Sequence, residues 1–116
     1  MEKVAFLENN DFSSDGKLAL KDPVIVLIYA NWCPPCEAFK PTFFDLANNT
    51  DIQIACIELD GHLPGQKELA DRIHDVFPDL QGTPTICAYV NGSIDSVFDG
   101  NRDLASLIQF SKKYTL

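Results

Sequence analysis

Two cysteines, Cys33 and Cys36, stand three positions apart in the segment Asn-Trp-Cys-Pro-Pro-Cys. A cysteine thiolate is a strong nucleophile, and two thiols at this spacing can close a small disulfide ring. The pair follows a continuous apolar run, which predicts that the thiols lie where a buried strand ends and a helix begins. The dipole and free amides of a helix start favour negative charge, so we expect the pKa of Cys33 to lie below the free value of about 8.5.

The two residues between the cysteines limit this effect. Pro34 and Pro35 occupy the first two positions of the expected helix, where proline is tolerated. Neither carries an N–H group, so two donors that could face a thiolate are missing, and the nearest remaining donors are the amide and thiol of Cys36. We therefore expect a pKa of Cys33 that is lowered, yet not to the bottom of the range of roughly 3.5–7.5 found for reactive cysteines.

Two other uses of a Cys-x-x-Cys pair remain open. A structural zinc site takes about four ligands, whereas a second Cys-x-x-Cys is absent and the other cysteines, Cys56 and Cys87, fall inside expected strands. A purely structural disulfide is rare in a reducing compartment. The pattern favours a redox couple, and we expect neither a metal nor another cofactor.

The composition is typical of one globular domain. The 116 residues are 46% hydrophobic and 22% charged, so we expect a single domain over 1–116. A formal net charge of −8 argues against nucleic acid as a partner, because an acidic surface repels phosphates. The longest apolar run, Val24–Ala30, is too short to span a bilayer, and the N-terminus lacks the features of a signal peptide. We expect a cytoplasmic monomer with no membrane partner.

The apolar pattern predicts alternating strands and helices. Strands are expected at Val4–Leu7, Val24–Tyr29, Ile52–Leu59, Thr85–Val90 and Ser93–Phe98, and helices at Phe12–Leu20, Pro34–Asn48, Gln66–His74 and Arg102–Tyr114, with a loop at Asp60–Gly65. The pair Asn91-Gly92 between two β-rich runs is a strong hairpin signal. Strand–helix–strand units favour parallel pairs, so this order predicts a mixed α/β sheet with helices on both faces.

The sequence resembles the thioredoxin family over nearly its whole length. Trp-Cys-Pro-Pro-Cys, from Trp32, stands where thioredoxins carry Trp-Cys-Gly-Pro-Cys, and Pro41 matches the proline that kinks the following helix. The loop Gly82–Thr85 matches the family's cis-proline loop, and Gly100 matches the glycine before the last helix. The resemblance implies a thioredoxin fold, in which a central mixed sheet of four to five strands is flanked by helices on both faces.

The resemblance also implies a protein-disulfide oxidoreductase mechanism. Cys33 would attack a substrate disulfide, and Cys36 would resolve the mixed disulfide. The residues expected to contact the substrate are Trp32, Pro34, Pro35, Thr83 and Pro84. The Thr83–Pro84 bond would be cis beside Cys33, and the backbone at Thr83 would pair with the substrate chain. The implied partners are protein disulfide substrates and a flavoprotein thioredoxin reductase or another thiol donor.

Several positions depart from the family's pattern, among them Tyr29, where thioredoxins commonly carry tryptophan. Thioredoxins carry a buried aspartate six residues before the first cysteine, where this chain has Leu27, and the nearby lysine is replaced by Cys56. The proton relay to the resolving cysteine is therefore missing. Three acidic residues, Glu37, Glu58 and Asp60, are candidates for a substitute base, with an ordinary solvated role as the alternative.

The remaining candidates have structural interpretations. Cys56 and Cys87 are expected to be buried strand thiols that act as small apolar residues, with a regulatory second pair as the alternative. His62 and His74 are expected at the surface. The segment 60–82 is longer than its thioredoxin counterpart, and it is interpreted as a surface insertion or else a partner-contact loop.

The leading functional hypothesis is a reductase of protein disulfides. Net oxidation or isomerisation of disulfides is a second enzyme hypothesis, which the reduction potential would separate from the first. A third is a thioredoxin-fold binding or scaffold module with weak activity, to which the missing aspartate at Leu27 gives weight.

Overall fold

The computed structural model describes residues 3–115. Five strands form one sheet in the order β1-β3-β2-β4-β5. The strands are β1 (Val4–Phe6), β2 (Val24–Tyr29), β3 (Gln53–Glu58), β4 (Thr85–Val90) and β5 (Ser93–Val97). β1, β3 and β2 run parallel, β4 is antiparallel to β2, and β5 is antiparallel to β4. The predicted mixed sheet with an antiparallel edge is confirmed.

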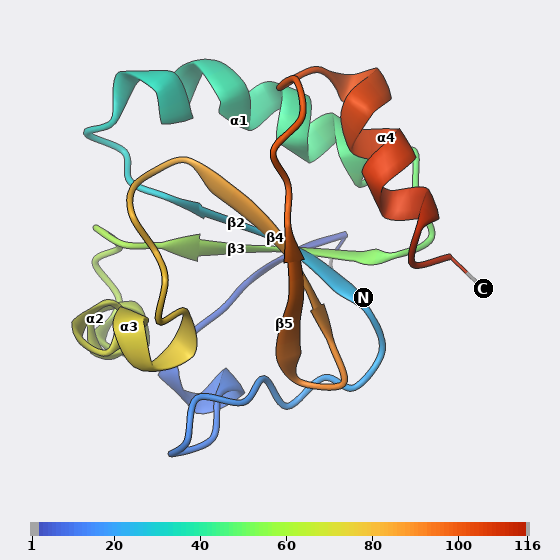
Figure 1. The fold of residues 1–116 in the computed structure, drawn as a ribbon. Coiled ribbons are helices and arrows are strands. Elements are labelled where there is room, and N and C mark those ends of the chain that lie inside the picture. Colours follow the sequence, from blue (N-terminus) through green and yellow to red (C-terminus); the bar gives the residue numbers. More distant parts are fainter. Residues whose placement is uncertain (1–2, 116) are drawn as a thin grey trace.

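Helices cover both faces of this sheet. The helices are α1 (Pro34–Leu46), α2 (Pro64–Asp71), α3 (Ile73–Val76) and α4 (Leu104–Lys112), with a 3-10 turn, η1, at Asn9–Asp11. α1 and α4 lie on one face, whereas α2, α3 and η1 lie on the other (Figure 1). None of the described helices is long and apolar enough to cross a bilayer.

β2 is the central strand, and all six of its residues are buried. Successive strand side chains point to opposite faces. Ile25 and Leu27 therefore pack in the core cluster that includes α1 and α4, whereas Val26 and Ile28 pack in the cluster that includes α2 and α3. A strand with two apolar faces must lie in the middle of the molecule, which explains the continuous apolar run before the cysteines.

The predicted helix at Phe12–Leu20 is wrong. Phe12 and Leu18 are buried and form an isolated antiparallel bridge around a turn. Within that turn Gly16 has a φ of 83°, and the backbone N–H of Lys17 donates to the Ser13 hydroxyl at 3.0 Å. Serine and aspartate side chains compete here for backbone groups, and the glycine adopts the positive φ that the turn requires, so the segment forms a turn rather than a helix.

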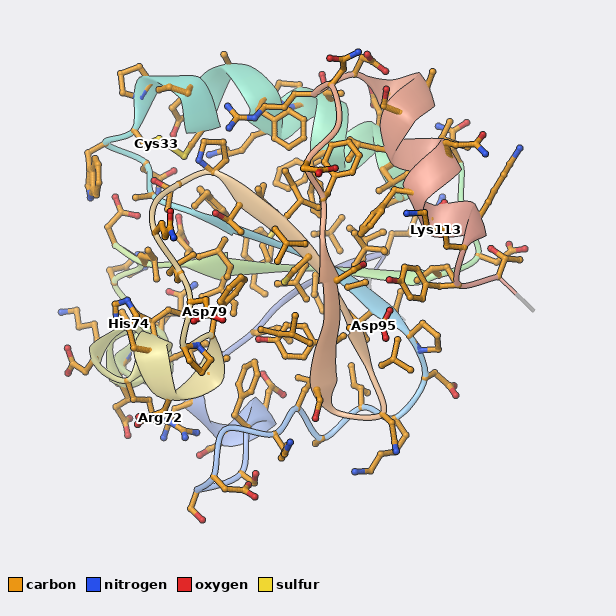
Figure 2. The ribbon with its side chains drawn as sticks, viewed as in Figure 1. Cys33, Arg72, His74, Asp79, Asp95 and Lys113 are labelled. Atoms are coloured by element: carbon orange, nitrogen blue, oxygen red, sulfur yellow. A yellow bond between two sulfur atoms is a disulfide. The ribbon has the colours of Figure 1, made fainter. Side chains whose placement is uncertain are left out.

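The segment 60–82 is more than a surface insertion. It contains α2 and α3, and its buried apolar residues Leu69, Ile73 and Val76 complete the core on one face of the sheet. α2 begins at Pro64, inside the predicted loop, and the predicted single helix is broken at Arg72. The guanidinium of Arg72, the residue at the break, reaches back to the chain around η1 (Figure 2).

The hairpin prediction is confirmed at Asn91-Gly92. Both residues have positive φ values, 54° and 88°, as a two-residue turn between twisted strands requires. The other expected strands and helices are present with bounds that differ by a few residues. α1 continues through Pro41.

Candidate active site

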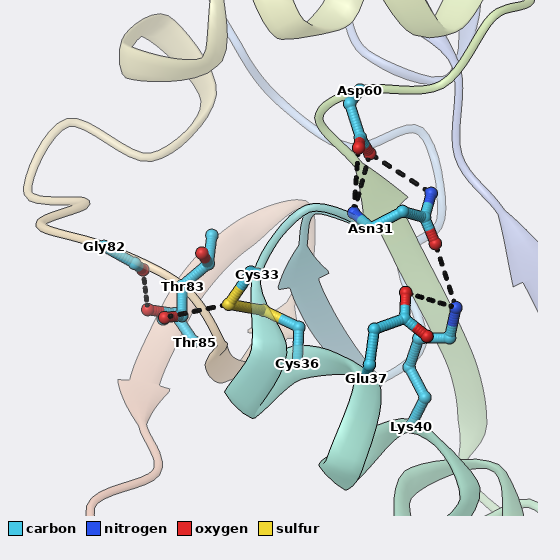
Figure 3. Close-up of a disulfide and its surroundings, with 9 residues drawn as sticks. All are labelled: Asn31, Cys33, Cys36, Glu37, Lys40, Asp60, Gly82, Thr83 and Thr85. Carbon is cyan, nitrogen blue, oxygen red and sulfur yellow. Dashed lines mark hydrogen bonds and ion pairs between the residues drawn. A yellow bond between two sulfur atoms is a disulfide. The ribbon is translucent and has the colours of Figure 1, made fainter.

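Cys33 and Cys36 are joined by a disulfide at the start of α1, with their Cα atoms 5.2 Å apart (Figure 3). β2 ends at Tyr29, and a turn closed by the Cys33 N–H, which donates to the Ala30 carbonyl at 3.2 Å, leads into the helix. Cys33 is the N-cap residue of α1, with an extended backbone. The predicted placement, where a buried strand ends and a helix begins, is confirmed.

The N-terminus of α1 offers few free amide groups. The first four N–H positions of a helix lack intrahelical partners, and here the second and third of them are Pro34 and Pro35, which have no N–H. The Cys33 N–H already donates to the turn. Only the N–H of Cys36 is left to face a thiolate on Cys33.

The two sulfur-bearing residues differ in exposure. Cys33 is 5% exposed and Cys36 is fully buried, whereas the preceding Trp32 is 72% exposed. Pro34 and Pro35 are exposed as well. An incoming thiol or thiolate therefore meets Cys33 first, at a rim formed by an indole and two proline rings.

The loop before β4 lies against this disulfide. The Sγ atom of Cys33 is 3.7 Å from the carbonyl oxygen of Thr83, and the Thr83–Pro84 peptide bond is cis, as expected. Pro84 is buried and Thr83 half-buried. The hydroxyl of Thr85 donates to the Gly82 carbonyl at 2.6 Å and fixes the loop. The predicted substrate-contact residues thus surround one sulfur pair, while their contact with a substrate stays a prediction.

The core beneath the disulfide is apolar. Leu27 and Cys56 are paired across β2 and β3, and both are fully buried in the same cluster as Cys36. Burial first, and then the charge of Glu58, raise the pKa of the Cys56 thiol to about 12, with a smaller opposing effect from Lys40. Cys56 is therefore a neutral thiol near pH 7 and supplies no base to Cys36.

Cys56 and Cys87 lie on opposite faces of the sheet. Cys56 pairs with Leu27, and Cys87 pairs with the adjacent β2 residue Val26. They accordingly belong to different core clusters. Burial also raises the pKa of Cys87 to about 12. The prediction of buried thiols is confirmed, and a regulatory disulfide between them is contradicted, because the sheet separates the two sulfurs.

A polar cluster borders the turn that leads to Cys33. Asn31 donates through its backbone and side chain to Asp60, and through its side chain to Glu58. Lys40 donates to the Asn31 side chain at 3.0 Å and lies 3.4 Å from Glu37. The three acidic candidates thus gather around Asn31 and Lys40, and the hydrogen bonds of their side chains within residues 3–115 do not involve Cys36.

The sequence patterns indicate no role for Asn31 or Lys40. Their signal was weak, because the partners of Asn31 lie 27 and 29 positions further along the chain. His62 and His74 are exposed, as expected. Within the described part of the chain, no three histidine, cysteine, aspartate or glutamate residues are grouped so that they could hold a metal ion.

The family model described as Thioredoxin matches residues 3–113. The chain belongs to the thioredoxin family. This thioredoxin-family protein is 32% identical over 97 residues to putative thioredoxin-5 of Dictyostelium discoideum, a match that covers 79% of the chain and 84% of that relative. It is 33% identical over 98 residues to protein disulfide-isomerase of Saccharomyces cerevisiae, but this match covers 80% of the chain and only 17% of the relative.

Solved structures of thioredoxin domains agree with the fold. The first thioredoxin domain of mouse protein disulfide-isomerase A4 superposes with a TM-score of 0.71 at 26% identity, covering 96% of the chain and 74% of that domain structure. Family membership and the Cys33–Cys36 pair together make this thioredoxin-family protein a thiol–disulfide oxidoreductase domain. A thioredoxin domain implies protein disulfides as substrates.

Proposed function

We propose that this protein reduces protein disulfides, with Cys33 as the nucleophile and Cys36 as the resolving thiol. The observation that supports this direction is the start of α1, where Pro34 and Pro35 leave one free amide near Cys33. A dithiol is a poor reductant when its thiolate is strongly stabilised. A thiolate that meets few donors is less stabilised, so the reduced form gives up its electrons more readily.

The reaction consists of two thiol–disulfide exchanges. The Cys33 thiolate attacks one sulfur of the substrate disulfide, forms a mixed disulfide and releases the other sulfur as a thiolate. Cys36, once deprotonated, attacks the Cys33 sulfur, closes the Cys33–Cys36 bond and releases the second substrate thiolate. Two electrons pass from the dithiol to the substrate, which leaves the protein in the oxidised form seen in the structure.

The substrate chain is proposed to lie across the rim of the site. The exposed side chains of Trp32, Pro34 and Pro35 offer an apolar surface beside Cys33. The backbone carbonyl of half-buried Thr83 lies 3.7 Å from the Cys33 sulfur, directly before Pro84. An extended substrate would hydrogen-bond this backbone as an added strand does.

The oxidised protein must be reduced again after each turnover. We propose a flavoprotein thioredoxin reductase or another thiol carrier as the electron donor. A cytoplasmic location belongs to the same proposal, because a reducing compartment suits a chain whose Cys56 and Cys87 are free thiols.

Reduction of insulin disulfides by dithiothreitol tests the proposal. Wild-type protein should accelerate the reaction, whereas Cys33→Ser should abolish the acceleration and Cys36→Ser should accumulate a mixed disulfide. Cys87→Ser is the matched control, because it removes a sulfur from the far side of the sheet and should retain activity. An inactive wild-type protein would support the scaffold hypothesis instead.

Disulfide oxidation or isomerisation is the second candidate. It is favoured by the 33% identity to yeast protein disulfide-isomerase. The reduction potential separates the two candidates, since a value near −270 mV is typical of thioredoxin and about −180 mV of protein disulfide isomerase. We expect the more negative value.

A further inference from the structure

The turn that delivers Cys33 to α1 is anchored through Asn31. The backbone N–H of Asn31 donates to both carboxylate oxygens of Asp60, at 3.0 and 2.9 Å. The turn is closed by the Cys33 N–H, which donates to the Ala30 carbonyl. The carboxylate of Asp60 therefore holds the backbone two residues before the reactive sulfur.

The side chain of Asn31 connects this turn with two other elements. Its amide nitrogen donates to Glu58 at the end of β3 and, at 3.2 Å, to Asp60. Its carbonyl oxygen accepts from the ammonium group of Lys40 on α1, at 3.0 Å (Figure 3). Both the donor and the acceptor groups of Asn31 are thus used, although the residue is exposed.

A second layer of contacts fixes one of these two acceptors, Glu58. The other carboxylate oxygen of Glu58 accepts from the side chain of Gln66 at 3.2 Å. Gln66 is buried, and its own amide oxygen accepts the backbone N–H of Leu63 at 3.2 Å. Through Glu58 the turn is therefore attached to a supported position at the end of β3, whereas the carboxylate of Asp60 is exposed.

We propose that Asp60 and Asn31 are positioning residues that set the redox equilibrium of the Cys33–Cys36 couple by fixing this turn. The equilibrium constant for closing a disulfide within one protein is proportional to the effective concentration of one thiol near the other. A fixed turn keeps Cys33 beside Cys36 in the reduced form, so the ring closes readily. Releasing the turn lowers that concentration and makes the couple more oxidising. The inference rests on the proposed roles of Cys33 and Cys36 and is independent of the direction of net reaction.

Equilibration with glutathione measures the effect directly. One reduced protein and one glutathione disulfide yield one oxidised protein and two reduced glutathione molecules, so electrons balance. Asp60→Ala should lower this equilibrium constant about tenfold, which corresponds to roughly 30 mV. Asp60→Asn keeps an oxygen that accepts the Asn31 N–H, and its constant should stay within about threefold of the wild type.

The pair of variants separates position from charge. Both remove the same charge, so the difference between them reports the hydrogen bond alone. Asp51→Asn removes one exposed carboxylate at the opposite end of β3 and should leave the constant unchanged. A contribution to folding alone would stabilise the oxidised and reduced forms equally and would not move the constant either.

Several outcomes would overturn the proposal. One is an equilibrium constant with glutathione for Asp60→Ala that lies within twofold of the wild-type value. Another is a shift of that constant that is equal in Asp60→Ala and Asp60→Asn. If circular dichroism shows that Asp60→Ala is unfolded, Asn31→Ala replaces it, because that variant loses only the side-chain contacts. It should shift the constant about threefold in the same direction, and no shift would refute the role of Asn31. A wild-type protein that does not equilibrate with glutathione would instead refute the proposed function.

Discussion

Leu27 lies directly opposite Cys56 across the parallel β2–β3 pair, and both side chains are fully buried beside the helix that carries Cys36. Thioredoxins resemble this arrangement in backbone but place a carboxylate and an ammonium group at these two positions. Here the resolving thiol has only apolar or neutral neighbours on that side. Deprotonation of Cys36 is consequently expected to limit the release of the mixed disulfide.

Leu27→Asp should therefore accelerate insulin reduction, most clearly near neutral pH, because a base is introduced under Cys36. The same change should lower the free energy of unfolding by about 2–4 kcal/mol, since it buries a carboxyl group in an apolar cluster. Turnover and urea unfolding should be measured together. Leu27→Asn provides the control, because it is polar but cannot accept a proton. Unchanged or slower turnover in Leu27→Asp would argue against a missing base.

Pro34→Ala should lower the pKa of Cys33, because it adds an N–H group at the start of α1. By analogy with carboxylates that accept several amide hydrogen bonds, the pKa of Cys33 should fall by roughly one unit for each added hydrogen bond. The pH dependence of iodoacetamide alkylation in the reduced protein gives the midpoint. Pro78→Ala, at an exposed site outside the helix, should leave it unchanged. An equal midpoint in wild type and Pro34→Ala would contradict the account of the prolines.

Alkaline pH should destabilise the protein through its buried thiols. Cys56 and Cys87 have native pKa values of about 12, against an ordinary value of 9.0. Above pH 9 the thiols of the unfolded chain lose protons that the native state keeps. The stability that the two buried thiols contribute is therefore fully present below pH 9 and is lost as the pH rises toward 12. At pH 10.5 each thiol should account for roughly 2 kcal/mol of lost stability.

Urea unfolding of the reduced protein at pH 7 and pH 10.5 measures that loss. Burial also raises the pKa of Tyr29 and Tyr89, so these two side chains add to the loss of stability at alkaline pH. Cys87→Ala should show a pH-dependent loss that is smaller by about one thiol's share. An identical pH dependence in this variant would show that Cys87 is not protected.

Arg72→Ala should destabilise the fold without changing the chemistry. The guanidinium donates to the Asn9 side chain at 2.6 Å and to the carbonyls of Asn9, Phe12 and Ser13 at 2.9–3.2 Å. Arg72 lies on the face of the sheet opposite Cys33 (Figure 2). Loss of these bonds should cost about 2–3 kcal/mol.

The matched control for that change is Arg102→Ala, which removes a guanidinium group from an exposed position. It should alter the free energy of unfolding by less than about 0.5 kcal/mol. Arg72→Lys should recover only part of the loss, because an ammonium group cannot reproduce the planar fork. The rate of insulin reduction should match the wild type in all three variants. A full recovery by lysine would show that charge, rather than the directed bonds, matters at Arg72.

Local sequence patterns were sufficient where a short segment determines its own structure. The apolar run Val24–Tyr29 predicted the central strand with its bounds, and Asn91-Gly92 predicted the hairpin. The spacing of Cys33 and Cys36 after that run predicted where the reactive pair lies. In each case the residues whose types make the prediction lie within one short segment of the chain.

Patterns failed where distant residues decide the outcome. The break between α2 and α3 falls at Arg72, whose partners lie about 60 positions earlier in the chain. The cluster at Asn31 depends in the same way on carboxylates at the end of the next strand and just beyond it. No periodicity encodes such contacts, so neither the break nor the anchor of the active-site turn was predicted.

The separation of Cys56 from Cys87 by the sheet limits which unwanted disulfides can form while the protein exchanges disulfides with its substrates. Every turnover generates an oxidised form in which misplaced bonds are a hazard. Because the sheet lies between these two sulfurs, and both are shielded from solvent, oxidation cannot join Cys56 to Cys87 in the native molecule. A disulfide between Cys56 and Cys87 then requires unfolding first.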